Sequence, residues 1–400
     1  MHESDFLIIG GGIIGLSIAR KLRKSFHGAK VILIEKETDC GLHASGRNSG
    51  VLHAGFYYSS DSLKARFTRD GNRRLTEYCE TKNLRINKCG KLIVTQSPSE
   101  FPQLDELLAR GKKNGVELKS IDAQEAKEIE PRVKTFDRAL FSPTTSSINP
   151  TEVVQSIISD ARSEKIEIHT GTKYLNRSPN GIVTSEGEYS AKFIVGAAGL
   201  YADKIAKDFG FSRNYRILPF KGLYLYSEEP ANTLKVHIYP VPDPKFPFLG
   251  VHFTITADGK TKIGPTAIPA FWREQYSGLE KFNLTEFTDI ALRQIELLTF
   301  SNFNFKKLAF EELRKYSRSR LVKLTNSMLE EVHLKDYHRW GKPGIRAQLF
   351  NLEKRKLEMD FIVEGDEKSL HILNAVSPAF TCAFPIADHI TERIMKTANF

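Results

Sequence analysis

The sequence has few cysteines and no long hydrophobic run. Its four cysteines are Cys40, Cys79, Cys89 and Cys382. No two form a CxxC pair, and their spacing suits neither a zinc site nor a disulfide framework. We therefore expect reduced thiols in a reducing compartment and no metal site. No window approaches the roughly 18 uninterrupted apolar residues of a transmembrane helix, so we expect no membrane span.

Internal repeats and low-complexity segments are also lacking. The chain is 40% hydrophobic and 26% charged, and its 400 residues suffice for two or three domains whose core can enclose a cofactor. The first apolar run, FLIIGGGIIGL, follows an acidic start and is broken by glycines, which favours a buried strand and turn over a signal peptide. We expect the protein to start at Met1 and to be cytoplasmic.

A glycine-rich motif stands near the N-terminus. The segment DFLIIGGGIIGLSIARKLRK predicts a strand over 6–9, a glycine turn and an amphipathic helix to about Lys24. The pattern G-x-G-x-x-G falls on Gly10, Gly12 and Gly15. The first glycine permits the tight turn, the second lets the backbone approach a pyrophosphate, and the third lets helix and strand pack closely.

The start of this helix and the next strand complete a predicted dinucleotide site. Phosphates would lie at the helix N-terminus, near the backbone of Ile13 and Ile14, where free N–H groups and the helix dipole favour negative charge. The strand KVILIEK ends in Glu35 and Lys36, and a carboxylate at Glu35 is placed to accept hydrogen bonds from an adenosine ribose. It would repel the 2′-phosphate of NADP, so FAD or NAD is favoured.

Further motifs along the chain resemble the D-amino-acid-oxidase-like superfamily of FAD oxidoreductases and, within it, the L-2-hydroxyglutarate oxidases and dehydrogenases. Besides the glycine fingerprint, the motifs that carry this resemblance are SGRNSGVLHAGFYY, DSLKARF, CGKLIV, VGAAGLYADKIA, LPFKG, IYPVPDPKFPFLGVHFT, IGPTA, GIRAQ and NAVSPAFTCAF. The stretch 305–339 is less motif-like, and Thr381-Cys382 stands where such enzymes usually carry small hydroxyl residues.

The resemblance implies an α/β fold in which a Rossmann-like FAD-binding domain is interleaved with a substrate domain built on an antiparallel sheet. The FAD domain would comprise 1–85, 150–215 and 345–400. The substrate domain would comprise 86–149 and 216–344. In support, residues 194–198 predict a central strand, and VHIYPV and VHFTITADGKTKIG show the alternation and turns of antiparallel strands.

The polar stretch HASGRNSGVLHAGFYY, residues 43–58, follows the predicted nucleotide-binding unit. In the family that it resembles, this stretch passes over the pyrophosphate and the flavin ring. Side-chain and backbone groups would contact the cofactor from Ser45, Gly46, Arg47, Asn48, Ser49 and Gly50.

His53 is the predicted general base. Oxidation of a 2-hydroxy acid requires removal of the hydroxyl proton while a hydride leaves Cα for flavin N5, and neutral imidazole suits that proton near pH 7. The alternative is a histidine that is hydrogen-bonded structurally beneath the flavin. His252 is the second candidate base, and His43 is expected to be structural or to face the phosphates.

A dicarboxylate substrate needs cations or strong donors in its pocket. Arg346 resembles the position that holds the substrate α-carboxylate in this superfamily, since a guanidinium matches a carboxylate bidentately. The alternative for Arg346 is a surface ion pair, although its neighbours favour a buried loop. Lys221 is a further catalytic candidate. It would lie near flavin N5, where a lysine assists dioxygen reduction in many flavoenzymes, or near the distal carboxylate; the alternative is a surface lysine. Tyr58 and Tyr239 would donate to a carboxylate, or simply pack.

The C-terminal segment SPAFTCAF precedes a predicted helix, PIADHITERIMK. In the superfamily, the N-terminus of such a helix points toward the flavin pyrimidine ring and stabilises negative charge there. Cys382 is expected to be a buried free thiol, although some relatives hold flavin covalently through cysteine. The remaining predicted cofactor contacts are Tyr174, Ala198, Gly199, Pro378, Ala379 and Thr381.

Basic and aromatic residues alternate over 303–325, and the net charge of the whole chain is +10. This stretch predicts either two helices with solvated basic faces or a peripheral contact with an anionic membrane, with Phe303 and Phe305 among the inserted residues. A membrane contact would suit electron delivery to quinone in place of dioxygen. No recognisable RNA-binding motif accompanies the charge, so nucleic acid is disfavoured.

These patterns together predict FAD-dependent oxidation of L-2-hydroxyglutarate, or a close 2-hydroxy acid, to the 2-oxo acid. An amine or amino-acid oxidase on the same scaffold is the first alternative. A flavin-binding tRNA-associated protein is the second.

Overall fold

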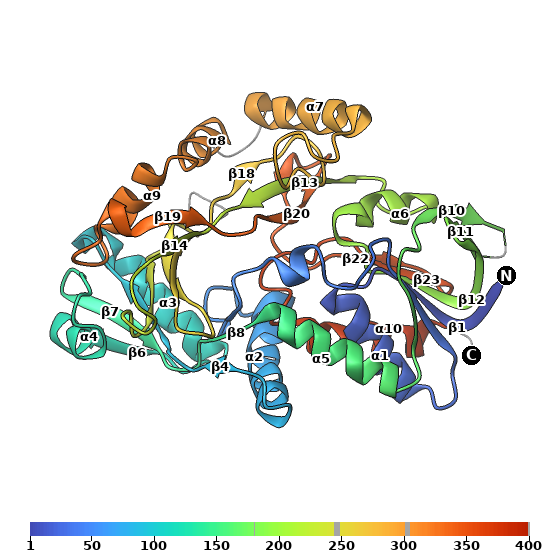
Figure 1. The fold of residues 1–400 in the computed structure, drawn as a ribbon, viewed down its shortest axis with the longest axis horizontal. Coiled ribbons are helices and arrows are strands. Elements are labelled where there is room, and N and C mark those ends of the chain that lie inside the picture. The colour runs from blue at the N-terminus through green and yellow to red at the C-terminus, as the bar shows by residue number, and fades with distance from the viewer. Residues whose placement is uncertain (180, 244–248, 301–304, 399–400) are drawn as a thin grey trace. The chain divides into compact units, whose positions relative to one another are not determined.

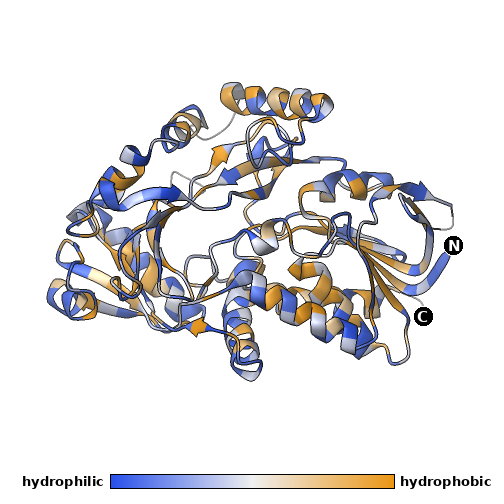
Figure 2. Ribbon diagram, in the orientation of Figure 1, coloured by the Kyte–Doolittle hydropathy of each residue, from blue (hydrophilic) through white to orange (hydrophobic). Residues whose placement is uncertain are grey.

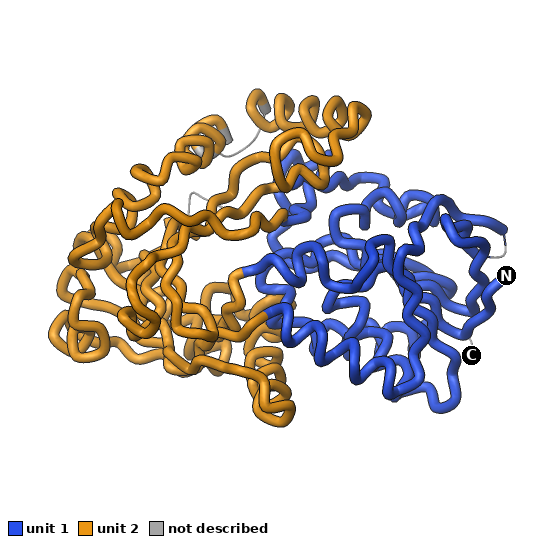
Figure 3. The backbone as a smooth tube through the Cα atoms, viewed as in Figure 1, with its two compact units in different colours: residues 1–48, 150–219, 346–400 blue, residues 49–149, 220–345 orange. Residues whose placement is uncertain are grey.

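The computed structural model describes residues 1–179, 181–243, 249–300 and 305–398. The chain divides into two compact units (Figure 3), unit 1 with residues 1–48, 150–219 and 346–400, and unit 2 with residues 49–149 and 220–345. The chain passes from one unit to the other within two strands, β13 (Tyr215–Gly222) and β20 (Gly344–Asn351). Each unit has its own sheet and its own hydrophobic core.

Unit 1 is built on an eight-stranded sheet with the order β10-β11-β12-β1-β2-β9, to which β23 and β22 add beside β12. Its strands are β1 (His2–Ile9), β2 (Val31–Ile34), β9 (Glu167–His169), β10 (Tyr174–Ser178), β11 (Gly181–Thr184), β12 (Gly187–Gly196), β22 (Val363–Gly365) and β23 (Ser369–Ile372). The central pairs β12–β1, β1–β2 and β2–β9 are parallel. This is the α/β arrangement that the first 36 residues predict.

Helices cover both faces of this sheet, because alternate residues of β1 are apolar on both sides. They are α1 (Ile13–Ser25), α5 (Pro150–Ser163), α6 (Ala202–Asp208) and α10 (Ala383–Thr397). Phe6 and Ile8 face α1, which packs against α5 and α10 (Figure 1). Leu7 and Ile9 form a separate core with Ile205 of α6. A short antiparallel pair joins the second half of β20 to β21 (Lys356–Leu357).

Unit 2 is built on a second eight-stranded sheet, with the order β19-β14-β17-β16-β15-β5-β7-β6. Its strands are β5 (Lys91–Val94), β6 (Lys119–Asp122), β7 (Arg138–Ser142), β14 (Leu225–Ser227), β15 (His237–Pro240), β16 (His252–Ile255), β17 (Thr261–Gly264) and β19 (Tyr337–Trp340). Neighbouring strands are antiparallel except β5 and β15, which are parallel. The predicted antiparallel sheet is therefore present with one parallel pair, an exception that the sequence did not indicate.

The remaining elements of unit 2 surround this sheet. A small sheet has the order β3-β8-β4. The bounds are β3 (Val51–Leu52), β4 (Ile86–Asn87), β8 (Ser146–Ile148), β18 (Ile268–Pro269), α2 (Leu63–Thr81), α3 (Phe101–Lys113), α4 (Ala123–Ile129), α7 (Leu284–Phe300), α8 (Phe305–Arg314) and α9 (Arg318–Thr325).

Residues 49–85 were expected in the FAD-binding domain, but the structure groups them with unit 2. The physical reason is strand pairing. Val51 and Leu52 of β3 pair with Ser147 and Ser146 of β8, and β8 pairs in turn with β4. Helix α2 packs on β3 and β4. These partners all belong to unit 2.

The two faces of the large sheet in unit 2 differ in chemistry, because successive side chains on a strand point to opposite sides. Figure 2 shows both hydrophobic and hydrophilic stretches in the strands of this unit. One face carries Leu92, Ile238, Phe253 and Ile263, which form a buried core with α9. The opposite side of the same strands carries the apolar Ile93 and six mostly polar residues that we call the polar face: Lys91, His237, Tyr239, His252, Thr254 and Lys262.

Candidate active site

The glycine loop of unit 1 fits a dinucleotide. Gly10 has φ +116°, and a Cβ there would lie 2.5 Å from the Ala197 carbonyl oxygen. A Cβ on Gly15 would lie 2.0 Å from the Gly10 carbonyl oxygen. At Gly12, by contrast, only Ser45 Oγ would come within 4 Å, at 3.1 Å. The loop is thus closed toward the protein at Gly10 and Gly15 and open at Gly12, where a phosphate would approach the backbone.

Glu35 joins the end of β2 to this loop. Its carboxylate accepts hydrogen bonds from the backbone N–H of Gly11 (2.7 Å) and of Glu37 (3.0 Å). The sequence did not indicate this local role. A carboxylate offers further lone pairs, so the predicted ribose contact stays a proposal that is compatible with both bonds.

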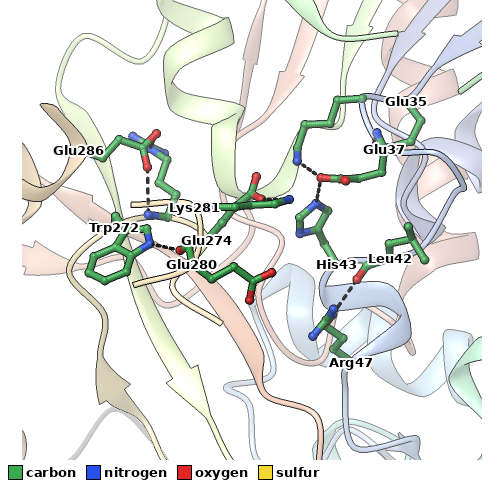
Figure 4. A network of polar contacts seen from close by, with 12 residues as sticks. Glu35, Glu37, Leu42, His43, Arg47, Trp272, Glu274, Glu280, Lys281 and Glu286 are labelled. Carbon is green, nitrogen blue, oxygen red and sulfur yellow. Dashed lines mark hydrogen bonds and ion pairs between the residues drawn. The ribbon is translucent and has the colours of Figure 1, made fainter. Parts of the chain in front are cut away.

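The segment after β2 folds back onto the helix start. Ser45 Oγ accepts a hydrogen bond from the N–H of Ile13 (2.9 Å), one of the amides expected to face phosphate. The side-chain amide of Asn48 donates to the Ser45 carbonyl oxygen (2.8 Å), and Arg47 Nε donates to the Leu42 carbonyl oxygen (2.8 Å; Figure 4). These polar side chains therefore shape the loop, in addition to any contact with a cofactor.

Lys36 and His43 both bind the carboxylate of Glu37. The distance from His43 Nε2 to Glu37 Oε1 is 2.9 Å (Figure 4), and Lys36 Nζ donates to the same oxygen. Burial raises the pKa of Glu37, but the hydrogen bonds and charges of Lys36 and His43 outweigh burial and lower that pKa to about 2. Within unit 1, His43 therefore has the structural partner that one of its two predicted roles requires.

The other predicted cofactor residues of unit 1 lie at the ends of strands and before α10. Ala198 follows β12, and its Cα would be 3.2 Å from a Cβ on Gly10, so the structure brings it to the glycine loop. Gly199 comes next, with φ +51°. Tyr174 begins β10, and its hydroxyl donates to Asp208 Oδ2 (2.9 Å).

Helix α10 begins at Ala383, close to the predicted start. Pro378, Ala379 and Thr381 directly precede it, and Thr381 is only 1% exposed. Cys382 is the N-cap residue of the helix, and its thiol is fully buried and outside any disulfide, as expected. Cys40 and Cys79 are buried as well. The predicted closing helix is present.

Ser49 and Gly50 belong to unit 2. The Ser49 carbonyl oxygen accepts a hydrogen bond from Lys262 Nζ (3.0 Å), and Gly50 has φ +78°. Lys262 was missed at the sequence level. Its ammonium lies 4.5 Å from the centre of the Tyr224 ring. Burial lowers the pKa of Lys262 to about 8, against the opposing effect of Asp258.

The structure brings the two candidate bases close to each other, with His252 on the polar face and His53 directly after β3. Burial lowers the pKa of His53 well below its ordinary value, and the charges of Lys91 and His252 lower it further. His252 is 4% exposed, and its Nδ1 lies 2.7 Å from the Gly250 carbonyl oxygen. Because a carbonyl can only accept, Nδ1 of His252 carries the proton and Nε2 of the neutral ring carries the lone pair.

His237 is a third histidine of this face that the sequence analysis did not select. Its Nδ1 accepts from the backbone N–H of Ile255 (3.0 Å), and its Nε2 lies 3.3 Å from Ser147 Oγ. The ring is fully buried, and burial together with neighbouring Lys91 lowers its pKa well below the ordinary value. The alternation of HIYP on β15 with HFTI on β16 was the signal that could have identified it.

The predicted substrate-binding residues differ in their burial and in their neighbours. Lys221 lies near the end of β13 and is 7% exposed, and burial lowers its pKa. Arg346 is half-buried on strand β20, not in the buried loop that its neighbours suggested. Tyr239 is buried on β15 and stacks on His252, with ring centres 3.6 Å apart. The Tyr58 ring lies 5.8 Å from Lys64 Nζ.

Comparison with known proteins identifies the family. The family described as FAD dependent oxidoreductase (DAO) matches residues 5–393. The chain belongs to the FAD-dependent oxidoreductase family. FAD, not NAD, is therefore its cofactor, and it is an enzyme.

Several similar proteins from distant organisms carry one description. The chain is 34% identical over 396 residues to L-2-hydroxyglutarate dehydrogenase from Escherichia coli K12, covering 98% of this chain and 93% of that protein. It is 36% identical to the mitochondrial L-2-hydroxyglutarate dehydrogenase of Nematostella vectensis, with 97% and 90% covered. It is 34% identical to the human mitochondrial L-2-hydroxyglutarate dehydrogenase, and the match covers 98% of this chain and 89% of that protein.

Solved structures show the same fold. L-alpha-glycerophosphate oxidase from Mycoplasma pneumoniae, with FAD bound, matches with a TM-score of 0.77 and 22% identity, covering 100% of this chain and 97% of that chain. Glycine oxidase from Geobacillus kaustophilus matches with a TM-score of 0.73 and 15% identity, with 100% and 96% covered. At these identities the likeness concerns the fold of this FAD-dependent oxidoreductase and not its substrate.

Proposed function

We propose that this FAD-dependent oxidoreductase oxidises L-2-hydroxyglutarate, or a close 2-hydroxy dicarboxylate, to the 2-oxo acid. The single observation that carries the chemistry is the pair of candidate bases, His53 and His252, beside the lysines of the polar face in unit 2. Such histidines can accept a hydroxyl proton, and lysines favour an anionic substrate. The names of the relatives at 34–36% identity support the choice of substrate.

The residues of the chain would divide the work as follows. FAD, when bound, supplies the acceptor for the hydride that leaves the substrate Cα. Gly10, Gly12 and the start of α1 would hold its phosphates, and Glu35 its ribose. His53 would take the hydroxyl proton, with His252 Nε2 as the second candidate.

The substrate has two carboxylates, which need separate partners. Arg346 would bind one of them through its guanidinium. Lys221 would favour the other, because an anion stabilises an ammonium that is only 7% exposed. Tyr58 and Tyr239 are proposed to complete the pocket.

Electron transfer onward is proposed to reach dioxygen or a membrane quinone. No helix of the described residues is long and apolar enough to cross a bilayer. Unit 2 nevertheless exposes apolar side chains on α7 and α8, among them Leu292 (62%), Ile295 (55%) and Phe310 (63%). Exposed Lys306 and Lys307 lie on α8. These features favour a peripheral membrane contact of the predicted 303–325 stretch, of which Phe303 lies outside the described residues.

Anaerobic mixing of the purified holoenzyme with L- and D-2-hydroxyglutarate tests the proposed substrate. We expect the visible flavin absorbance to bleach with the L enantiomer alone, and the product to be 2-oxoglutarate without ammonia. Bleaching by glycine with release of ammonia, or by sarcosine with release of an aldehyde, and none by either hydroxy acid, would replace this proposal with an amine oxidase. His53→Ala and His252→Ala, compared in the same assay, would assign the base through the rate of bleaching.

A further inference from the structure

Lys91 has an unusual environment for a lysine. It begins β5 and is completely buried. Aromatic rings surround its ammonium, with centres 4.1 Å (Tyr239), 5.3 Å (Tyr57) and 5.7 Å (Phe56) from Nζ. Within the described part of the chain, Nζ has no hydrogen-bond acceptor. A buried ammonium without an anion destabilises a fold, so an apolar side chain would fill this space at lower cost.

Lys91 belongs to a stack that reaches a candidate base. The strand order β16-β15-β5 places Tyr239 of β15 between His252 and Lys91. The Tyr239 and His252 rings are nearly parallel, at 20° and 3.6 Å between centres. Lys91 on β5 therefore approaches the Tyr239 ring by a cation–π contact, while His252 on β16 stacks on the same ring. The hydrogen bond from His252 Nδ1 to Gly250 holds the far end of the stack.

The charge of Lys91 acts on the same group of histidines. Burial is the main reason why the pKa values of His53 and His237 are low, and the next cause in both is Lys91, followed by His252. Burial lowers the pKa of Lys91 itself to about 7, with the Cys89 thiol opposing. On acidification Lys91 therefore gains its proton first, and its charge then opposes protonation of the histidines.

We propose that Lys91 is a positioning residue of the active site, which holds the Tyr239–His252 stack in place from the neighbouring strand β5 and keeps the neighbouring histidines in their proton-accepting form. This inference rests on the proposed function, because it assigns the histidines to the substrate proton. Lys91 acts through them and through Tyr239. Its ammonium lies among the rings of Phe56, Tyr57 and Tyr239, so we assign it no direct contact with the substrate.

Lys91→Met tests the proposal, because it keeps the length of the side chain and removes the charge. Lys119→Met on β6 is the matched control, since it removes the same charge from the same sheet at a side chain that is 59% exposed. Both holoenzymes are labelled with 13C at histidine Cε1 and titrated by NMR without substrate, with His53 assigned by His53→Asn. In parallel, kcat/KM for L-2-hydroxyglutarate is measured against pH with an artificial electron acceptor.

We expect Lys91→Met to raise the titration midpoint of His53 by about one pH unit and to move the acidic limb of kcat/KM upward by the same amount. That shift corresponds to roughly tenfold lower activity below the limb. Lys119→Met should leave both unchanged. A uniform loss of kcat with an unmoved limb, or a higher KM alone, would mean a packing or substrate-binding role and would overturn the proposal.

Two further measurements keep the test decisive. If Lys91→Met loses FAD, the titration of the wild-type holoenzyme is used instead. A His53 titration midpoint at 6.5 or above overturns the proposal. A lower midpoint, together with a lysine Cε signal that titrates near 7, supports it. Tyr239→Phe keeps the ring and should leave the limb in place. Because the histidine titration needs no substrate, it still responds to Lys91 if L-2-hydroxyglutarate fails to reduce the flavin.

Discussion

At the scale of single residues, the buried lysines of unit 2 make stability depend on pH. The pKa of Lys91 is lowered by burial to about 7, whereas a lysine in an unfolded chain titrates near 10.4. Between these values the unfolded chain binds a proton that the folded protein does not. The free energy of unfolding therefore rises with pH across this window, and the destabilising effect of Lys91 is fully present below pH 7.

We accordingly expect Lys91→Met to be more stable than the wild type at pH 7, although less active. The advantage should shrink by roughly 1.4 kcal/mol for each pH unit between 7 and 10. Thermal unfolding of both proteins at pH 7 and 9.5 measures this difference. A variant that is less stable than the wild type at pH 7, with a gap independent of pH, would show that the Lys91 ammonium is stabilised in the fold.

At the scale of elements, strand β16 shows how one short segment serves both core and site. Phe253 is 0% exposed in the apolar core, and His252 points to the polar face. The register that pairs His252 with Gly264 and Phe253 with Ile263 holds this alternation in place. A shift by one residue would exchange the two side chains and bury the imidazole in the core.

Neighbouring substitutions on β16 should therefore have opposite consequences. Phe253→Ala is expected to lower the free energy of unfolding by about 3–5 kcal/mol, because it leaves a cavity in a closed core. His252→Asn retains a donor for the Gly250 carbonyl, so it should change stability by less than about 1 kcal/mol and mainly lower kcat. Unfolding curves and steady-state kinetics of the two variants check this; equal losses of stability would contradict the assignment of faces.

At the scale of the whole molecule, charge and exposed apolar surface act together. The net charge is +10. Helix α7 buries Ile290 and Leu297 on one side and exposes Leu292 and Ile295 on another. A helix that is apolar on more than one side exposes apolar surface to the solvent, whereas an ordinary surface helix exposes a polar face. We therefore extend the proposed membrane contact from 303–325 back into α7.

Vesicle binding tests this surface. The protein should co-sediment with vesicles that contain anionic phosphatidylglycerol, and less so at high salt. Leu292→Glu with Ile295→Glu should weaken binding at least tenfold, because both apolar insertion and charge attraction are reduced. Leu175→Glu is the control, since it adds a carboxylate at another exposed apolar residue, 50% exposed on β10. Equal binding by all three proteins would contradict the proposed contact.

The sequence alone determined the parts of this protein that depend on local chemistry. The strand, glycine loop, helix and second strand of unit 1 follow from apolar periodicity and from backbone geometries that only glycine allows, and the structure has them as predicted. The closing helix α10 follows from its periodic pattern in the same way. These elements needed no knowledge of distant contacts.

Only the tertiary structure decided which polar side chains share a face. Lys91 in KLIV and Lys262 in TKIG look like ordinary strand lysines, and the alternation in HIYP indicates a strand but not which side chains surround His237. They come together because β5, β15, β16 and β17 pair across long stretches of chain. Strand pairing of this kind, and the burial that changes a pKa, depend on partners far away in the sequence. Local patterns therefore predict the dinucleotide loop, whereas the polar face appears only in the folded sheet.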